Sequence, residues 1–462
     1  MEMNYSEARE YLKNVNKLGS ILGLNTIKEL LKRLGNPQNE LKVVHIAGTN
    51  GKGSIMTFVQ NILIESGYKV GRYCSPAVFN EREIIRINNE YISEEQSADL
   101  LTRIKEKCDS MYSEGLPHPT SFEIETAEAL MFFKEQNCDI ALIECGMGGE
   151  TDATNVFEKV LCSVIATISL DHTQFLGSTI EEITKVKSGI IKENCPVVMS
   201  KQIVEAESVI KKVCKQNNSK LIIPTEQDSE NVEIDGLTTK VTYKASNNKE
   251  YILNLQALGT YQIKNAKTAV EVALVLDKAL TEKTNICDES DKNNSTGMKN
   301  NINNSGNTIE KNIKKGIEKT VWPGRMEVIS KEPLIIIDGA HNPGAVLELR
   351  KTLDLYFTNK RITFIMGVLS DKDFSKEAEI IADRAERIIT ITPNNSRGLD
   401  GHKLAETLVK YNHNVQVADS LKQAAEESIY TIKENRADMI LAFGSLSYLG
   451  ELKQVVRLIC NH

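Results

Sequence analysis

Residues 41–67 read LKVVHIAGTNGKGSIMTFVQNILIESG, an apolar run followed by a glycine-rich loop and a helical pattern. The run 41–47 predicts a buried strand, and 55–66 predicts an amphipathic helix. In the loop between them, glycines let backbone N–H groups turn toward a phosphate, and the helix N-terminus adds a partial positive charge. The sequence therefore predicts a phosphate-binding loop whose key positions are Gly51, Lys52, Gly53 and Ser54.

This loop departs from the common G-x-x-x-x-G-K-[ST] pattern, because position 46 is Ile and Gly53 separates the lysine from the serine. A glycine-rich turn that binds nothing is the alternative, but the intact strand–loop–helix context favours phosphate binding. A second glycine run, at 146–149, is not interpreted as a dinucleotide site because the turn-like segment 151–155 follows it where a helix is required.

Short apolar runs alternate with helical patterns along the rest of the chain, which predicts an α/β protein with parallel strands. Residues 232–255 alternate and carry polar turns, which predicts small antiparallel strands. The other expected strands are 70–74, 139–144, 161–169, 196–199, 334–338, 361–367, 387–392, 415–418 and 439–443. The expected helices of the first series are 94–113, 122–136, 179–192, 203–217 and 262–280.

The chain of 462 residues corresponds to two or three domains at about 150 residues each. Residues 284–315 are rich in Asn, Lys and Ser, so we expect a flexible surface insertion there with almost nothing to bury. A second α/β series follows this segment. We place a domain boundary near 318–325, giving domains of 1–320 and 321–462.

Composition excludes several classes of protein. Lys+Arg 56 against Asp+Glu 63 gives a net charge of −7, which argues against nucleic acid as the main partner. No apolar run reaches the roughly 18 residues that span a bilayer, and the N-terminal MEMNYSEAREYLK has no apolar signal region. Nine scattered cysteines without a C-x-x-C pair favour reduced thiols in a cytoplasmic protein over disulfides or zinc.

Polar residues stand where three expected strands end: Ser75, Glu144 and His172. Ligands of doubly wound sheets lie beyond the carboxyl ends of the strands. A hydroxyl, a carboxylate and an imidazole beside a phosphate loop suit Mg²⁺ that bridges a nucleotide. Singly, Ser75 could cap a turn and His172 could be structural, so the prediction rests on their conjunction.

The second series has a comparable strand end. Asp338 closes an apolar strand, and Asn342-Pro343 supplies an N-cap and a first-turn proline for the next helix. Asp338 and His341 are therefore expected on a strand–helix loop, a usual place for ligands. A capping turn without a ligand is the alternative.

Nine motifs follow one another along the chain: HIAGTNGKGS (45–54), CSPAVFNERE (74–83), TSFEIETAEAL (120–130), ECGMGGETDATN (144–155), DHTQFLGSTIEEITKVKSGIIK (171–192), ALGTYQIKNA (257–266), WPGRMEV (322–328), DGAHNP (338–343) and FGSLSYLGE (443–451). In this order they resemble the folylpolyglutamate synthase and dihydrofolate synthase family, within the Mur-ligase superfamily of ADP-forming amide ligases. The resemblance runs from about residue 5 to the C-terminus, except for the Asn-rich insertion, and its specificity is high.

The resemblance implies an N-terminal P-loop ATPase domain and a smaller C-terminal Rossmann-like glutamate-ligase domain, with the active site between them. It implies that Gly51 to Ser54 hold the phosphates of ATP and that the strand-end trio Ser75, Glu144 and His172 binds Mg²⁺, with two ions in all. Asn265, Arg325 and Asp338 would contact ATP, and His341 would lie near the phosphates. Lys52, Lys187, His341 and Arg325 are the implied catalytic residues.

Lys187 falls where the family carries a carbamylated lysine, an anion able to help hold the second Mg²⁺. A solvated helix lysine is the alternative, and composition alone favours it. For a pterin substrate the resemblance implies the segment 120–123, which begins with Thr120, together with Thr151, Asp152 and Ala153. The segment 23–25 is a fainter candidate. Two departures, Glu150 for a frequent Arg and Ala77 for the His of S-P-H, put the substrate preference in doubt rather than the ATP chemistry.

The implied reaction is ATP-dependent addition of L-glutamate to a folate through an acyl phosphate, with release of ADP and phosphate. Whether dihydropteroate is also an acceptor stays open, and we expect a monomer. Another Mur-type ligase is one alternative, but those enzymes typically carry a domain ahead of the loop, and only 47 residues precede Gly48. A P-loop ATPase without ligase activity and a kinase are the others.

Overall fold

The structure is a computed structural model that describes residues 2–16, 23–225, 232–290 and 308–460. Its larger part is built on an eight-stranded sheet of order β4-β3-β2-β5-β1-β6-β7-β8. The strands are β1 (Val43–Ala47), β2 (Val70–Tyr73), β3 (Ile85–Ile87), β4 (Glu90–Tyr91), β5 (Ile140–Glu144), β6 (Cys162–Ile165), β7 (Val197–Met199) and β8 (Leu221–Ile222). Only the edge formed by β3 and β4 is antiparallel among these described strands.

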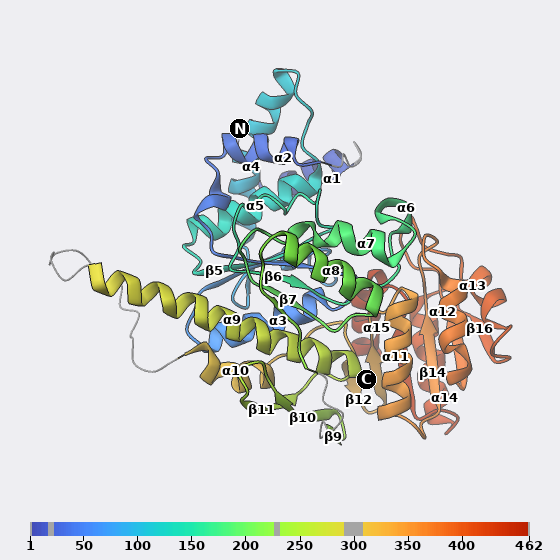
Figure 1. The fold of residues 1–462 in the computed structure, drawn as a ribbon. Helices are drawn as coiled ribbons and strands as arrows, with labels where there is room; N and C mark the ends of the chain where they lie inside the picture. The colour runs from blue at the N-terminus through green and yellow to red at the C-terminus, as the bar shows by residue number, and fades with distance from the viewer. Residues whose placement is uncertain (1, 17–22, 226–231, 291–307, 461–462) are drawn as a thin grey trace.

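Helices cover both faces of this sheet because its central strands, β1, β2, β5, β6 and β7, bury side chains on both sides. On one face lie α1 (Tyr5–Asn16), α2 (Asn25–Arg33), α4 (Glu94–Ser113) and α5 (Ser121–Glu135). On the other lie α3 (Lys52–Glu65), α9 (Thr260–Ser290) and α10 (Ile309–Glu318). The helices α6 (Thr173–Leu176), α7 (Ile180–Lys187) and α8 (Val204–Gln216) pack around β7. Figure 1 shows the strands β5, β6 and β7 between α4 and α5 above and α9 below.

A small antiparallel sheet of order β11-β10-β9 extends the second of these faces. Its strands are β9 (Val232–Asp235), β10 (Thr238–Lys244) and β11 (Glu250–Leu255). The inward residues Val241 and Leu253 share an apolar core with Phe58 of α3 and Val270 of α9. The strand expectation for 232–255 is therefore confirmed.

The C-terminal part is a six-stranded sheet of order β12-β13-β17-β14-β15-β16, in which only β12 is antiparallel within the described chain. The strands are β12 (Glu327–Lys331), β13 (Leu334–Ile337), β14 (Ile362–Met366), β15 (Arg387–Thr390), β16 (Val415–Val417) and β17 (Met439–Phe443). One face is covered by α11 (Pro343–Tyr356), α12 (Phe374–Ile381) and α13 (Gly401–Leu408), and the other by α14 (Leu421–Lys433) and α15 (Leu449–Cys460). Five short 3₁₀ helices complete the described elements: 37–40, 81–84, 188–190, 382–384 and 446–448.

The α/β fold class expected from the sequence is correct, and each expected strand overlaps an observed one. The insertion is different. Helix α9 continues to Ser290, and α10 begins at Ile309 with Ile309 and Ile313 buried against α3. The expectation that 284–315 has almost nothing to bury is therefore wrong at its C-terminal end, where isoleucines at helical spacing form an apolar face. The central part of the segment lies outside the described residues.

None of the helices in the described ranges is long and apolar enough to cross a lipid bilayer.

Candidate active site between the two sheets

The glycine-rich loop lies at the centre of the larger sheet, because β1 is flanked by β5 and β6. The backbone N–H groups of Thr49 and Asn50 donate to the carbonyl oxygen of Thr167, at 2.9 and 3.0 Å, which fixes the loop to the segment after β6. Helix α3 then begins at Lys52. The first N–H groups of a helix have no partner within it, so the turn formed by Lys52, Gly53 and Ser54 presents free donors to an anion.

Two glycines of this loop are required by close contacts. Gly51 has φ +88°, and a Cβ there would lie 2.6 Å from Oδ1 of Asn265 on α9. A Cβ at Gly53 would lie 2.8 Å from the ring of Trp322. The loop is thus closed in by α9 on one side and by the WPGR segment on the other, which also places the predicted ATP contact Asn265 beside Gly51.

Lys52 lies between the loop and the carboxylate of Glu144. Its Nζ donates to the carbonyl oxygen of Gly48 at 3.1 Å and lies 3.6 Å from Oε1 of Glu144. The two side chains meet because the neighbouring strands β5 and β1 end side by side. Glu144, the last residue of β5, pairs with Ile46, which is one residue before the end of β1 and the start of the loop. The thiol of Cys74 donates to the other oxygen of Glu144, at 2.6 Å. The structure therefore places Lys52, Glu144 and the residue preceding Ser75 in one cluster.

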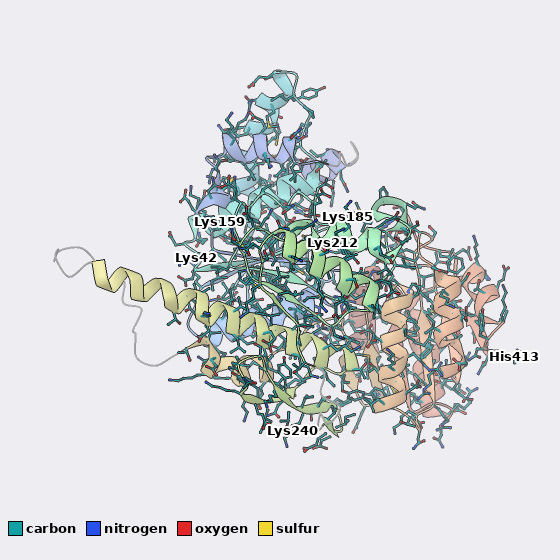
Figure 2. The ribbon with its side chains drawn as sticks, viewed as in Figure 1. Lys42, Lys159, Lys185, Lys212, Lys240 and His413 are labelled. Atoms are coloured by element: carbon teal, nitrogen blue, oxygen red, sulfur yellow. The ribbon has the colours of Figure 1, made fainter. Side chains whose placement is uncertain are left out.

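Lys187 reaches the same loop from α7. Its buried Nζ donates to the carbonyl oxygen of Gly48 at 3.0 Å. Lys185, two residues earlier and labelled in Figure 2, is exposed, because residues two apart do not lie on the same face of a helix. Burial, with the nearby charge of Lys52, lowers the pKa of Lys187 to about 8. A lysine with that pKa is partly neutral near neutral pH, which is the form that reacts with CO₂.

The predicted metal ligands are only partly joined by direct contacts. Ser75 follows Cys74, whose thiol holds Glu144. His172 has φ +50° at the start of α6 and is partly exposed. Burial lowers the pKa of its imidazole, and Lys187 and Lys52 are among the charges that act on it. The described residues contain no group of three or more His, Cys, Asp and Glu side chains arranged around a cation.

This donor set nevertheless fits Mg²⁺ bound together with a nucleotide. Glu144 is buried and already faces a cation, the ammonium of Lys52. Magnesium takes one or two protein carboxylates and completes its shell with water and phosphate oxygens, so a larger cluster of acids is not needed. A carboxylate, a hydroxyl and an imidazole beside a phosphate loop meet that requirement.

Asp338 of the second sheet is buried with both oxygens engaged. One accepts from the Tyr261 hydroxyl at 2.6 Å and from the N–H of Met326 at 2.8 Å, and the other accepts from the N–H of Ala340 at 2.8 Å. Tyr261 belongs to α9, which packs on the larger sheet, and Asp338 directly follows β13 of the second sheet. Their hydrogen bond therefore links the two parts of the molecule close to Arg325. The predicted contact of Asp338 with ATP is not tested by these bonds and stays a prediction.

Arg325 and His341 lie next to each other on this side of the site. The guanidinium of Arg325 lies against Gly339, where a Cβ would collide with it. The imidazole Nδ1 of His341 lies 2.7 Å from the carbonyl oxygen of Gly339. Burial, with the charge of Lys372, lowers the pKa of His341 to about 4, so this imidazole is neutral at physiological pH.

Contacts between the two sheets close the site. Asn50 of the glycine-rich loop and Asn342, the N-cap of α11, exchange two amide hydrogen bonds, each of 3.2 Å. Asn342 also donates to Asp171 at 3.1 Å, and Lys372 pairs with Asp171 at 2.8 Å. Burial opposes ionisation of Asp171, but Lys372 outweighs it and holds the pKa of this carboxyl at about 2.

A cavity of about 480 Å³ lies beside the cluster formed by Lys52, Glu144 and Cys74. It is lined by Ser75 and by residues predicted for the pterin substrate: Thr120, Phe122, Glu123, Thr151, Asp152 and Ala153. Gly23, from the fainter candidate segment, lines it as well. Segments from α1, α5 and the loops after β2 and β5 are thus brought around one space, and Ser75 belongs both to it and to the predicted metal site.

Sequence reasoning missed several residues of the site. Asn50 and Asp171 stand inside recognised motifs, but nothing local shows that they meet Asn342 and Lys372. Lys372 lies in GVLSDKD after an apolar strand, a polar strand end of the kind that singled out Asp338. Three further cavity residues were also overlooked: Arg9, Glu81 and Glu125.

Two family models match the chain on either side of the expected boundary. The Mur ligase middle domain matches residues 46–273, and the Mur ligase glutamate ligase domain matches residues 324–446. The first contains the phosphate loop and the metal candidates, and the second begins one residue before Arg325.

Full-length relatives agree with these matches. The dihydrofolate synthase/folylpolyglutamate synthase of Bacillus subtilis is 30% identical over 461 residues, covering 97% of this chain and 98% of the relative. The crystal structure of folylpolyglutamate synthase from Thermotoga maritima has a TM-score of 0.76 and 32% identity, covering 98% of this chain and 96% of that one. A solved FPGS–AMPPCP–folate complex has a TM-score of 0.79 and 28% identity, covering 98% of this chain and all of the other, 100%. The chain therefore belongs to the folylpolyglutamate synthase/dihydrofolate synthase family, the ATP-dependent glutamate ligases of the Mur ligase superfamily.

Proposed function

We propose that this chain joins the amino group of L-glutamate to the carboxylate of a pterin-bearing acceptor, either dihydropteroate, a reduced folate or both. The observation that carries the proposal is the position of Ser75. It lines the 480 Å³ cavity with the predicted pterin residues and follows Cys74, which holds Glu144 beside Lys52. An acceptor in the cavity can therefore direct its carboxylate toward the terminal phosphate of ATP on the loop.

The ATP side of the reaction uses groups from both sheets. Gly51 to Ser54 hold the phosphates through the N–H groups of the first turn of α3 and through the Lys52 ammonium. Asn265 and Asp338 contact ATP at the edges of the site, and His341 lies near the phosphates as a neutral hydrogen-bonding group. Arg325 shields the terminal phosphate from the second sheet, so the set of cations is complete only when the sheets are together.

Ser75, Glu144 and His172 would hold Mg²⁺, and this ion supplies charge neutralisation at the phosphate oxygens. We assign a carbamate to Lys187, formed when its neutral amine adds to CO₂ and releases a proton. The carbamate would help hold a second Mg²⁺ and would replace the repulsion between Lys187 and Lys52 by attraction.

The chemistry then proceeds in two steps. A carboxylate oxygen of the acceptor attacks the terminal phosphorus, ADP leaves, and an acyl phosphate forms. The neutral amine of glutamate attacks the acyl carbon, and phosphate leaves with that oxygen while the nitrogen loses a proton. The protein contributes by positioning the reactants and shielding charge, and the Asn50–Asn342 contact helps exclude water that would hydrolyse the acyl phosphate.

The test is incubation of the protein with MgATP and L-glutamate, separately with dihydropteroate and with tetrahydrofolate. ADP release with a product heavier by one glutamyl residue supports the proposal and names the acceptor. Phosphate release that needs neither acceptor nor glutamate would instead indicate a simple ATPase. Phosphate retained on the product would indicate a kinase, and activity with a different acid or amine only would indicate another Mur-type ligase.

A further inference from the structure

The acceptor cavity contains charged residues to which the family resemblance assigns no role. Arg9 extends from α1 to its wall, and Glu81 and Glu125 line it as well. Nε of Arg9 lies 2.9 Å from Oε2 of Glu81, while its Nη1 lies 3.8 Å from Oε1 of Glu125. The inference below rests on the proposed function, because it concerns what this cavity recognises.

The carboxylates of the cavity differ in how they are engaged. Glu123 accepts from the N–H and the hydroxyl of Thr120, at 2.8 and 3.0 Å, as the capping box of α5. Asp152 accepts from the N–H groups of Met147 and Thr154, at 2.8 and 3.0 Å. Both carboxylates are therefore occupied in holding their own loops.

Glu125 is engaged only loosely by comparison. Its closest ion pair, with Arg9, is longer than a hydrogen bond at 3.8 Å, and its side chain is 21% exposed. Burial raises the pKa of Glu125 to about 7, against the opposing effect of Arg9. A partly desolvated carboxylate with free acceptor capacity gains more from a donor than a fully solvated one does.

Glu125 also lies next to an aromatic surface. Phe122 lines the cavity three residues earlier on α5, and side chains three apart occupy one face of a helix. The Phe122 ring packs directly over Gly146, where a Cβ would lie 2.5 Å from it. The cavity wall thus combines a flat apolar face with a carboxylate about one helical turn away.

A 2-amino-4-oxopteridine matches this pair of features. Its ring system is flat, and its N3–H and 2-amino groups form a two-donor edge that a carboxylate can accept in a bidentate manner. We propose that Glu125, oriented by Arg9, is a specificity-determining residue that accepts hydrogen bonds from the N3–H and 2-amino edge of the acceptor's pterin. Arg9 is then a positioning residue, whose positive charge favours the ionised form of the carboxylate against the effect of burial and which does not contact the pterin edge.

The experiment compares two acceptors on three proteins: the wild type, Glu125→Gln and the control Glu81→Gln, which removes the other carboxylate paired with Arg9. The acceptors are whichever pterin the wild type uses and its 2-desamino analogue, with ADP release as the readout. Loss of a bidentate contact to a charged group should raise KM for the pterin by about 10- to 100-fold in Glu125→Gln, with kcat within about twofold. The KM for the 2-desamino analogue should be almost the same on the wild type and on Glu125→Gln. The control Glu81→Gln should keep the wild-type preference for the 2-amino acceptor.

If Glu125→Gln raised KM by the same factor for both acceptors, the proposal would be overturned, since the residue would then matter only for the shape of the cavity. An unchanged KM would overturn it as well. Glu125→Asp keeps the charge and serves as a second variant, with an intermediate KM expected, should the amide variant not fold. If the wild type adds glutamate to neither pterin acceptor, it is the proposed function that fails.

Discussion

The ammonium groups of Lys52 and Lys187 donate to one carbonyl oxygen, that of Gly48, at 3.1 and 3.0 Å. Two cations on one acceptor repel each other, and this repulsion adds to the effect of burial, which is the main cause of the lowered pKa of Lys187. Glu144 lies on the Lys52 side of this pair, so a negative group on Lys187 would give Lys52 an anion on each side. This arrangement accounts for a buried lysine at the end of α7.

Replacing Lys52 with Ala should lower kcat by about 10²- to 10³-fold, because the terminal phosphate loses a preorganised cation during transfer. Initial rates of ADP formation measure the effect. Lys42, an exposed lysine labelled in Figure 2, provides the matched control, and Lys42→Ala should retain the rate. Near-normal turnover in Lys52→Ala would contradict the role given to Lys52.

Lys187 should form a carbamate, which ¹³C NMR would detect after incubation with ¹³C-bicarbonate. Since the pKa of Lys187 is about 8, its neutral fraction falls about tenfold for each pH unit below that value, and carbamate formation should slow in proportion. Lys187→Ala should lose the signal and most activity. Exposed Lys185→Ala should keep both, and a signal that survives in Lys187→Ala would contradict the assignment.

The ion pair between Asp171 and Lys372 should stabilise the joined sheets, because both side chains are about nine-tenths buried, at 10% and 9% exposed. Lys372→Met leaves the carboxylate without its cation and should lower the free energy of unfolding by about 3–5 kcal/mol in urea titrations. Asp171→Asn combined with Lys372→Met should recover part of that loss. The exposed pair of Lys376 and Glu379 is the control, and a loss of stability in Lys372→Met no larger than that in Lys376→Met would refute the prediction.

Glu377 on α12 should make stability fall as pH rises. Its carboxyl is fully buried, neither oxygen has a hydrogen-bond partner, and burial raises its pKa to about 8, although Lys372 opposes this while Asp373 and Asp171 reinforce it. The folded state therefore holds a proton that the unfolded state releases near pH 4.5, so stability is lost between about pH 4.5 and 8, at up to about 1.4 kcal/mol per unit.

Glu377→Gln keeps the shape of the side chain and removes its titration. The melting temperature of this variant should exceed that of the wild type increasingly from pH 5 to pH 8.5. If the difference in melting temperature between the two proteins were the same at every pH in that range, Glu377 would not titrate as described.

The sequence was most informative where the physics is local. Continuous apolar runs such as 140–143, within the predicted strand 139–144, predicted the central strands, because parallel strands buried on both faces need no polar alternation. The glycine-rich loop and the polar residues after each strand likewise followed from short motifs. Glu144 and Lys52 were expected at one sheet edge, and in the structure their side chains lie 3.6 Å apart.

What the sequence did not predict depends on how distant segments pack. Asn50 and Asn342 are 292 residues apart, and their contact requires the relative position of two sheets. Ile309 and Ile313 were hidden by the Asn- and Lys-rich composition around them, although their spacing is helical. Glu125 reads as an ordinary helix residue until α1 brings Arg9 to it.

The most direct test of amide ligation follows an oxygen atom. The acceptor is labelled with ¹⁸O in the carboxylate that becomes the amide and is incubated with MgATP and L-glutamate, and the released phosphate is analysed by mass spectrometry. The account predicts one ¹⁸O atom in each phosphate, because the oxygen that attacks the terminal phosphorus departs with it. Unlabelled phosphate accompanying amide product would contradict activation of the acceptor by phosphoryl transfer.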